Sequence, residues 1–188
     1  MEGLMFLCMF GIIGVCAWAL LKDRIWIGIG VSTVLTAVMI VGVANAGHIY
    51  ENADRTVFMF TGKIEMGNSR EILHATDKSK LYMESPGGDA WEALQIGYII
   101  KAKELDVSTY EGKPCDSACA FAAIMGKTIK GKYGFHAPYA KGHNPTEMET
   151  QFVYDMFRKY MRSTGKLTDA QIEKILSTPS SDLMYITW

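Results

Sequence analysis

The chain contains 188 residues, of which 49% are hydrophobic and 21% are charged, and its formal net charge at neutral pH is −1. This balanced charge excludes a general nucleic-acid binder, which needs a basic surface, and the hydrophobic content excludes intrinsic disorder. The four cysteines are too few for a disulfide scaffold and lack the spacing of a metal finger, so we expect neither a metal nor a cofactor.

The first 46 residues differ in composition from the rest of the chain, and their only charged side chains are Glu2, Lys22, Asp23 and Arg24. The uncharged segments 4–21 and 25–44 are each long enough to cross a hydrocarbon core of about 30 Å. The charged triplet between them therefore predicts a hairpin of two transmembrane helices. Because positively charged loops stay in the cytoplasm, residues 47–188 would form a periplasmic domain at a bacterial-type inner membrane.

A cleaved leader is a second interpretation of the same segment. Lys22 and Arg24 would then belong to the basic region of a signal peptide, and residues 25–42 would be its apolar region. Ala44-Asn45-Ala46 fits the small-residue cleavage pattern. A buried helical hairpin is the third interpretation, and only the first two place the domain outside the cytoplasm.

Strands and helices alternate along residues 47–188. The β-branched and aromatic stretches predict strands at 56–61, 80–84 and 107–110, with one or two short strands within 127–135. Apolar periodicity and capping residues predict helices at about 68–76, 89–105, 117–125, 145–162 and 168–176. This order predicts an α/β domain with parallel strand pairing through right-handed crossovers.

Three short motifs lie where a strand gives way to a helix or a turn. Ser85-Pro86-Gly87-Gly88 can present backbone N–H groups that no side chain covers. Ser117, within Cys115-Asp116-Ser117-Ala118-Cys119, lies at the start of a small apolar helix, where negative charge is favoured. His136 follows a predicted strand and precedes Ala137-Pro138. Each motif alone is common, as a turn, a helix cap or a structural histidine.

In this order the three motifs resemble the Clp protease proteolytic subunit superfamily, over roughly residues 56–187. The likeness is greatest to its membrane-linked or periplasmic Clp-like branch. The resemblance implies a Clp/crotonase-like ββα spiral domain, here preceded by the transmembrane hairpin. It also implies that Ser117 is the nucleophile and His136 the general base. The amides of Gly88 (or Gly87) and Ala118 would form the oxyanion hole.

The third catalytic residue is not fixed by the motifs. Asp182 is the nearest acidic candidate after His136, and Asp155 and Glu147 are poorer candidates. A Ser–His dyad, an acid from a partner subunit and an inactive site also remain open. His143 is the alternative base, and a Ser–Lys dyad would use one of the nearby lysines, Lys127, Lys130 and Lys132.

Cys115 and Cys119 lie four residues apart on either side of Ser117. Outside the cytoplasm they could form a disulfide that braces the nucleophile turn, and the alternative is two buried free thiols. Asp116, between them in the sequence, is expected to cap the following helix.

The resemblance implies a membrane-anchored serine endopeptidase that hydrolyses peptide bonds through an acyl-enzyme at Ser117. No nucleotide-binding loop occurs in the sequence, so the activity itself would be independent of ATP. Expected partners are a peptide or protein substrate, membrane lipid, further copies of the chain and a membrane protein. The alternatives are a catalytically inactive binding or assembly module at the membrane and, less strongly, chemistry on coenzyme A thioesters.

Overall fold

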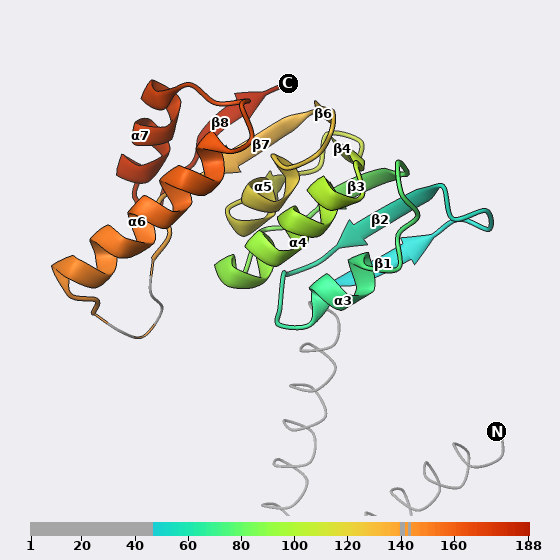
Figure 1. The fold of residues 1–188 in the computed structure, drawn as a ribbon, viewed down its shortest axis with the longest axis horizontal. Coiled ribbons are helices and arrows are strands. Elements are labelled where there is room, and N and C mark those ends of the chain that lie inside the picture. Colours follow the sequence, from blue (N-terminus) through green and yellow to red (C-terminus); the bar gives the residue numbers. More distant parts are fainter. Residues whose placement is uncertain (1–46, 140–141, 143) are drawn as a thin grey trace, which may run out of the picture. The chain divides into compact units, whose positions relative to one another are not determined.

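Two mixed β-sheets and five helices make up residues 47–139, 142 and 144–188, the part of the chain that this computed structural model describes (Figure 1). The larger sheet has the strand order β1-β2-β3-β4-β6. Its strands are β1 (His48–Glu51), β2 (Val57–Thr61), β3 (Lys80–Glu84), β4 (Asp106–Thr109) and β6 (Ile129–Lys130). β1 pairs with β2 in antiparallel fashion, and every other neighbouring pair is parallel.

Alternating side chains of this sheet form one wall of the core. Phe58 and Phe60 on β2 are buried, as are their neighbours Leu81 and Met83 on β3. Val107 on β4 lies opposite Leu81 and is also buried. This period of two is the reason why the short apolar stretches form strands rather than helices.

Along the chain, three helices lie between strands of the larger sheet: α3 (Asn68–Ile72), α4 (Ala90–Ala102) and α5 (Ala118–Ala123). Asp89 starts α4, because its carboxylate accepts a hydrogen bond of 2.8 Å from the Glu92 N–H. All six residues of α5 are buried, and four of them are alanines. Small side chains allow α4 and α5 to lie side by side, as Figure 1 shows.

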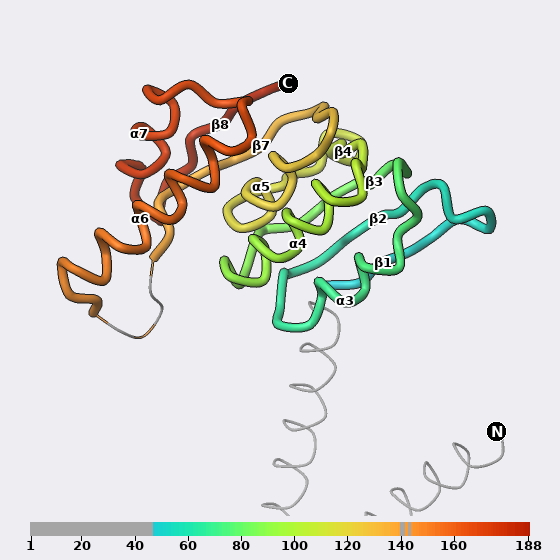
Figure 2. Tube along the Cα trace, viewed as in Figure 1, coloured from blue at the N-terminus to red at the C-terminus, as the bar shows by residue number. Residues whose placement is uncertain are grey.

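The smaller sheet has the order β5-β7-β8 and contains β5 (Cys115–Asp116), β7 (Lys132–Phe135) and β8 (Met184–Thr187). β5 is parallel to β7, whereas β8 is antiparallel to it. Between β7 and β8 the chain forms α6 (Glu147–Arg162) and α7 (Asp169–Ser177), and each begins with a capping box. In the trace these two helices lie at the β7–β8 end of the domain, away from β1 (Figure 2).

Three of the observed strands were not predicted, namely the two-residue β5 and the longer strands β1 and β8. β1 has three exposed residues out of four, and β8 alternates between half-buried and exposed residues, so neither has a strong apolar pattern. Each is antiparallel to a more buried strand, β2 or β7. Pairing with these neighbours, rather than local propensity, makes them strands.

The fold-class prediction is wrong. We expected a Clp/crotonase-like spiral domain behind a transmembrane hairpin, whereas the structure describes an α/β domain with two mixed sheets. Over residues 47–139, 142 and 144–188, no helix combines the length and the apolar composition that crossing a membrane requires. The segments predicted to span the membrane, 4–21 and 25–44, lie outside the described residues.

Candidate active site

Ser117 occupies a sharp turn between strand β5 and helix α5. Its backbone has φ 57° and ψ −125°, a conformation that non-glycine residues rarely adopt. The Ser117 N–H donates a hydrogen bond of 2.7 Å to the Gly134 carbonyl of β7, which helps to hold the turn. Strained residues persist only where their surroundings fix them, and a serine on a strained strand-to-helix turn is typical of a nucleophile.

A disulfide joins the two ends of the same turn. Cys115, in β5, and Cys119, in α5, are joined with their Cα atoms 5.2 Å apart. Both cysteines are fully buried. The covalent bond therefore links the strand before Ser117 directly to the first turn of the helix after it.

The Pro-Gly-Gly turn packs against Ser117. Gly87 has φ 94° and Gly88 has φ 147°, values that favour glycine. A Cβ atom on Gly87 would lie 2.6 Å from the Cβ of Ser117, and one on Gly88 would collide with the carbonyl of Ile64. Only glycine allows the chain to pass this close to both segments.

The hydrogen bonds of the turn distinguish between the two glycine amides. The Gly87 N–H donates to the Ser85 hydroxyl at 3.1 Å. The Ile64 N–H donates to the Gly87 carbonyl, and the Asp89 N–H donates to the Ile64 carbonyl, both at 2.9 Å. In this parallel bridge the two neighbours of Gly88 make the hydrogen bonds to Ile64, so the N–H of Gly88 points away from Ile64. Within the described residues, the amides of Gly88 and Ala118 have no hydrogen-bond partner. The geometry therefore favours Gly88 over Gly87 as an oxyanion donor.

His136 lies directly after β7 and is buried, with 6% of its surface exposed. Its Nδ1 is 2.7 Å from the carbonyl oxygen of Ala137. Because a carbonyl only accepts hydrogen bonds, this contact places the proton on Nδ1 and leaves Nε2 as an acceptor. The Ala137 N–H in turn donates to the carbonyl of Thr178, at the end of α7, at 2.9 Å.

One cleft of about 890 Å³ brings these groups together. Its lining includes all the catalytic and oxyanion residues predicted from the sequence, namely Ser117, His136, Asp182, Gly87, Gly88 and Ala118. Three large apolar side chains also line it and are exposed by more than half of their surface, namely Met66, Trp91 and Tyr139.

The predicted acids occupy different places. Asp182 lines the cleft but is exposed, and its carboxylate accepts a hydrogen bond of 2.8 Å from the Leu183 N–H. Asp155 lies on α6 and pairs with Arg158, and neither it nor Glu147 lines the cleft. The alternative base, His143, lies outside the described residues.

The lysines proposed for a Ser–Lys dyad are placed elsewhere. Lys127 pairs with Glu104, and the Lys132 ammonium lies 4.1 Å from the centre of the Tyr185 ring. Neither these two nor Lys130 lines the cleft.

Asp116 does not cap α5, contrary to the prediction. The helix has Ser117 at its N-cap position, without a side-chain cap hydrogen bond. Asp116 is one of the residues that line the cleft, and its carboxyl lies against Gly134 of β7. Its buried Oδ1 has no hydrogen-bond partner among the described residues. In a strand, neighbouring side chains point to opposite faces, so the burial of Cys115 in the core was a signal for the opposite placement of Asp116.

Metal ligands do not gather in the part of the chain that the structure describes. No group of three or more histidine, cysteine and acidic side chains there could hold a metal ion. No model of a known protein family matches the sequence, and no curated protein matches it either.

Proposed function

We propose that the protein is a serine peptidase that cleaves peptide bonds through an acyl-enzyme on Ser117. A single observation carries this proposal. A serine with φ 57°, in a strand-to-helix turn, lines the same cleft as a histidine and two unpaired backbone amides. The resemblance to the Clp superfamily adds the order of the three motifs along the chain.

The first step needs a base beside the serine, because a neutral hydroxyl is a weak nucleophile. Nε2 of His136 takes the proton of the Ser117 hydroxyl while the oxygen attacks the substrate carbonyl carbon. The carbonyl π electrons move to the oxygen, which becomes an oxyanion. His136 then gives the proton to the departing amine as the peptide C–N bond breaks, and water releases the acyl group by the reverse sequence.

Negative charge develops on the substrate oxygen in this step, and the N–H groups of Gly88 and Ala118 are available to donate hydrogen bonds to it. The N–H of Ala118 lies in the first turn of α5. A preorganised donor of this kind is worth about 3 kcal/mol in known enzymes. The Ala137 carbonyl holds the imidazole tautomer that the proton transfer requires.

The surroundings of the site suggest a polypeptide substrate. Met66, Trp91 and Tyr139 offer exposed apolar surface beside the glycine turn, as a cleft for peptide side chains needs. We also propose an oxidising compartment outside the cytoplasm, since the Cys115–Cys119 disulfide persists there. Assembly into a homo-oligomer stays a prediction.

The test is covalent labelling by a fluorophosphonate that carries a fluorophore. Wild-type protein is expected to be labelled, and Ser117→Ala is expected to abolish both labelling and any peptidase activity. Ser181→Ala is the matched control, because Ser181 is an exposed serine of the same cleft and its variant should be labelled normally.

Absence of labelling in the wild type would overturn the peptidase proposal. Retention by immobilised coenzyme A thioester would then favour the thioester alternative. Without either result, the binding or assembly module is the remaining candidate.

A further inference from the structure

A half-buried carboxyl group lies on the smaller sheet, on the strand next to the one that leads to the candidate base. In the register of this sheet, Asp116 of β5 is paired with Gly134 of β7, and Tyr185 of β8 pairs with Gly134 from the other side. A Cβ atom on Gly134 would collide with Oδ1 of Asp116 and would lie 2.9 Å from the Tyr185 ring. Because Gly134 has no side chain, the Asp116 carboxylate can occupy the space that a Cβ atom would take.

His136 is on the same side of β7 as this space. Tyr133 and Phe135 are fully buried in the core, so the alternating residues Lys132, Gly134 and His136 face the other way. Asp116 and His136 are both among the residues that line the cleft. The carboxylate is therefore one strand away and two residues along from the imidazole.

The Asp116 carboxyl lies in a partly desolvated position. Burial raises its pKa. The charge of Lys132, hydrogen bonds from the Gly134 N–H and the Tyr185 hydroxyl and, least of all, the charge of His136 act in the opposite direction. Its Oδ1 is buried without a hydrogen-bond partner in the described part of the chain.

We propose that Asp116 is the positioning residue of the site, stabilising the His136 imidazolium through the field of its carboxylate across Gly134. This inference rests on the proposed function. It assigns to Asp116 the electrostatic role that the sequence assigned to Asp182. The tautomer of His136 is held separately, by the Ala137 carbonyl.

The proton balance of this arrangement is simple. When Ser117 attacks, its proton moves to Nε2 of His136 and the imidazole becomes a cation. The Asp116 carboxylate keeps its charge throughout and accepts no proton. A nearby negative charge stabilises the imidazolium relative to the neutral ring and so favours the transfer of the Ser117 proton.

Other charged groups face the same histidine and must be separated from Asp116 in a test. Asp182 lines the cleft on the chain before β8. The remaining titratable groups around the imidazole and the carboxylate are Lys63, Glu65, Asp89, Lys132, Tyr139 and Tyr185.

The experiment measures the rate of fluorophosphonate labelling against pH in the wild type, Asp116→Asn and Asp182→Asn. Labelling needs a proton acceptor for Ser117, so the acid limb of the profile appears where the base of the site becomes protonated. Loss of the Asp116 charge is expected to shift this limb by about one unit to lower pH. Asp182→Asn is the matched control and should leave the limb in place.

A purely structural role of Asp116 would lower the rate without moving the limb. An unmoved limb in Asp116→Asn, with a labelled wild type, overturns this proposal and leaves the peptidase proposal intact. A shift in Asp182→Asn alone assigns the role to Asp182. An unlabelled wild type contradicts the peptidase proposal itself. If Asp116→Asn does not fold, Asp116→Ser replaces it, because a smaller neutral side chain fits the space of the carboxylate.

Discussion

At the scale of single residues, the site depends on how closely the Pro-Gly-Gly turn approaches Ser117. The backbone of Ser117 has an unfavourable conformation, and its surroundings keep it there through the Gly134 carbonyl and the neighbouring turn. Gly87 lies against the Cβ of Ser117 and has the backbone conformation of a glycine. The Ser117 side chain therefore fits in this position because Gly87 has no side chain.

Gly87→Ala tests this dependence. The added Cβ would lie 2.6 Å from that of Ser117 and should displace the nucleophile, which lowers the labelling rate roughly 100-fold. Overpacking of this kind also costs about 1–3 kcal/mol of stability, which thermal unfolding measures.

Gly112→Ala is the control for backbone strain in this experiment. Gly112 has φ 74°, but a Cβ there would meet nothing within 4 Å. This variant should keep wild-type labelling and lose less stability. Equal labelling of both glycine variants would contradict the role of close packing at Ser117.

At the scale of elements, the junction of β5 and α5 determines where the nucleophile lies. β5 has only two residues, and α5 has six. Such short elements have little stability of their own, because only a few backbone hydrogen bonds hold each of them. The disulfide between Cys115 and Cys119 adds a covalent link across the junction.

Replacement of both cysteines by alanine should weaken this junction. In the chain-entropy account, closure of so short a loop contributes about 2 kcal/mol, which a guanidinium unfolding curve measures. We also expect slower labelling of Ser117, because its turn loses one of the links that hold it. Reductant added during the unfolding measurement should lower the free energy of unfolding of the wild-type protein and leave that of the double variant unchanged. If reductant affects both proteins equally, the disulfide is not the cause.

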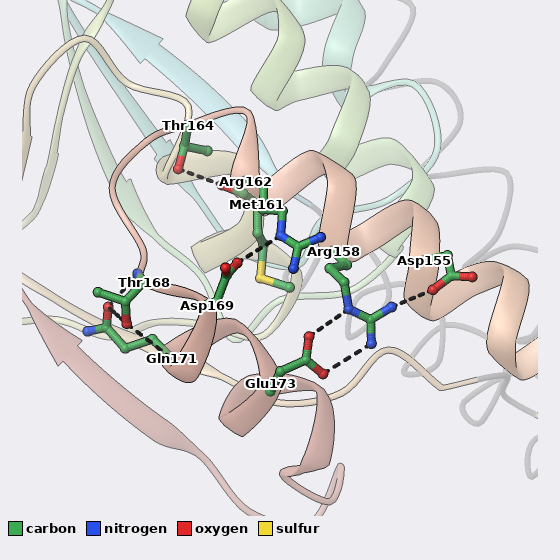
Figure 3. Close-up of polar contacts among 9 residues, drawn as sticks. All are labelled: Asp155, Arg158, Met161, Arg162, Thr164, Thr168, Asp169, Gln171 and Glu173. Atoms are coloured by element: carbon green, nitrogen blue, oxygen red, sulfur yellow. Dashed lines mark hydrogen bonds and ion pairs between the residues drawn. The ribbon is translucent and has the colours of Figure 1, made fainter.

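At the scale of the whole domain, the C-terminal helices hold the base in place. The Thr178 carbonyl, at the end of α7, accepts the hydrogen bond of Ala137, the neighbour of His136. α7 is tied to α6 by ion pairs, which Figure 3 shows: Arg158 contacts Glu173 at 2.6 and 3.1 Å, and Arg162 contacts Asp169 at 2.8 Å. The position of His136 therefore depends on how α6 and α7 pack.

Arg158→Met tests the link between the two helices through its pH dependence. The hydrogen bond and charge of Arg158 lower the pKa of Glu173 below its ordinary value of 4.5. A carboxyl with a lowered pKa in the folded state stabilises the protein above its ordinary pKa, and this contribution disappears as the pH falls through the lowered value. We expect a small loss of thermal stability at neutral pH that vanishes in strong acid.

Lys159→Met is the matched control for this measurement. Lys159 is an exposed cation on the same helix, and its replacement removes a charge outside these ion pairs. Melting curves of both variants at several pH values decide the question. A loss for Arg158→Met that persists unchanged at low pH would show that packing, rather than the ion pair, was removed.

Local patterns were sufficient for the elements that the sequence predicted. The capping boxes at Thr146 and Thr168 and the alternation in β2 and β3 act within a few residues, so they can be read along the chain. The three motifs predicted which side chains the site would need. The sequence predicted Ser117 at the start of a helix and His136 just after a strand, and in the structure these residues lie at the start of α5 and directly after β7.

Other features depend on contacts between residues that are far apart in the sequence. β1 and β8 are strands because β2 and β7 offer hydrogen-bond partners. The choice between the Gly87 and Gly88 amides depends on Ile64, and the burial of Asp116 depends on the missing side chain of Gly134. The sequence by itself determined which chemical groups the protein carries and in what order. The tertiary structure alone decided which donors stay unpaired and which residues line the cleft with Ser117, because register and burial come from partners that no local pattern specifies.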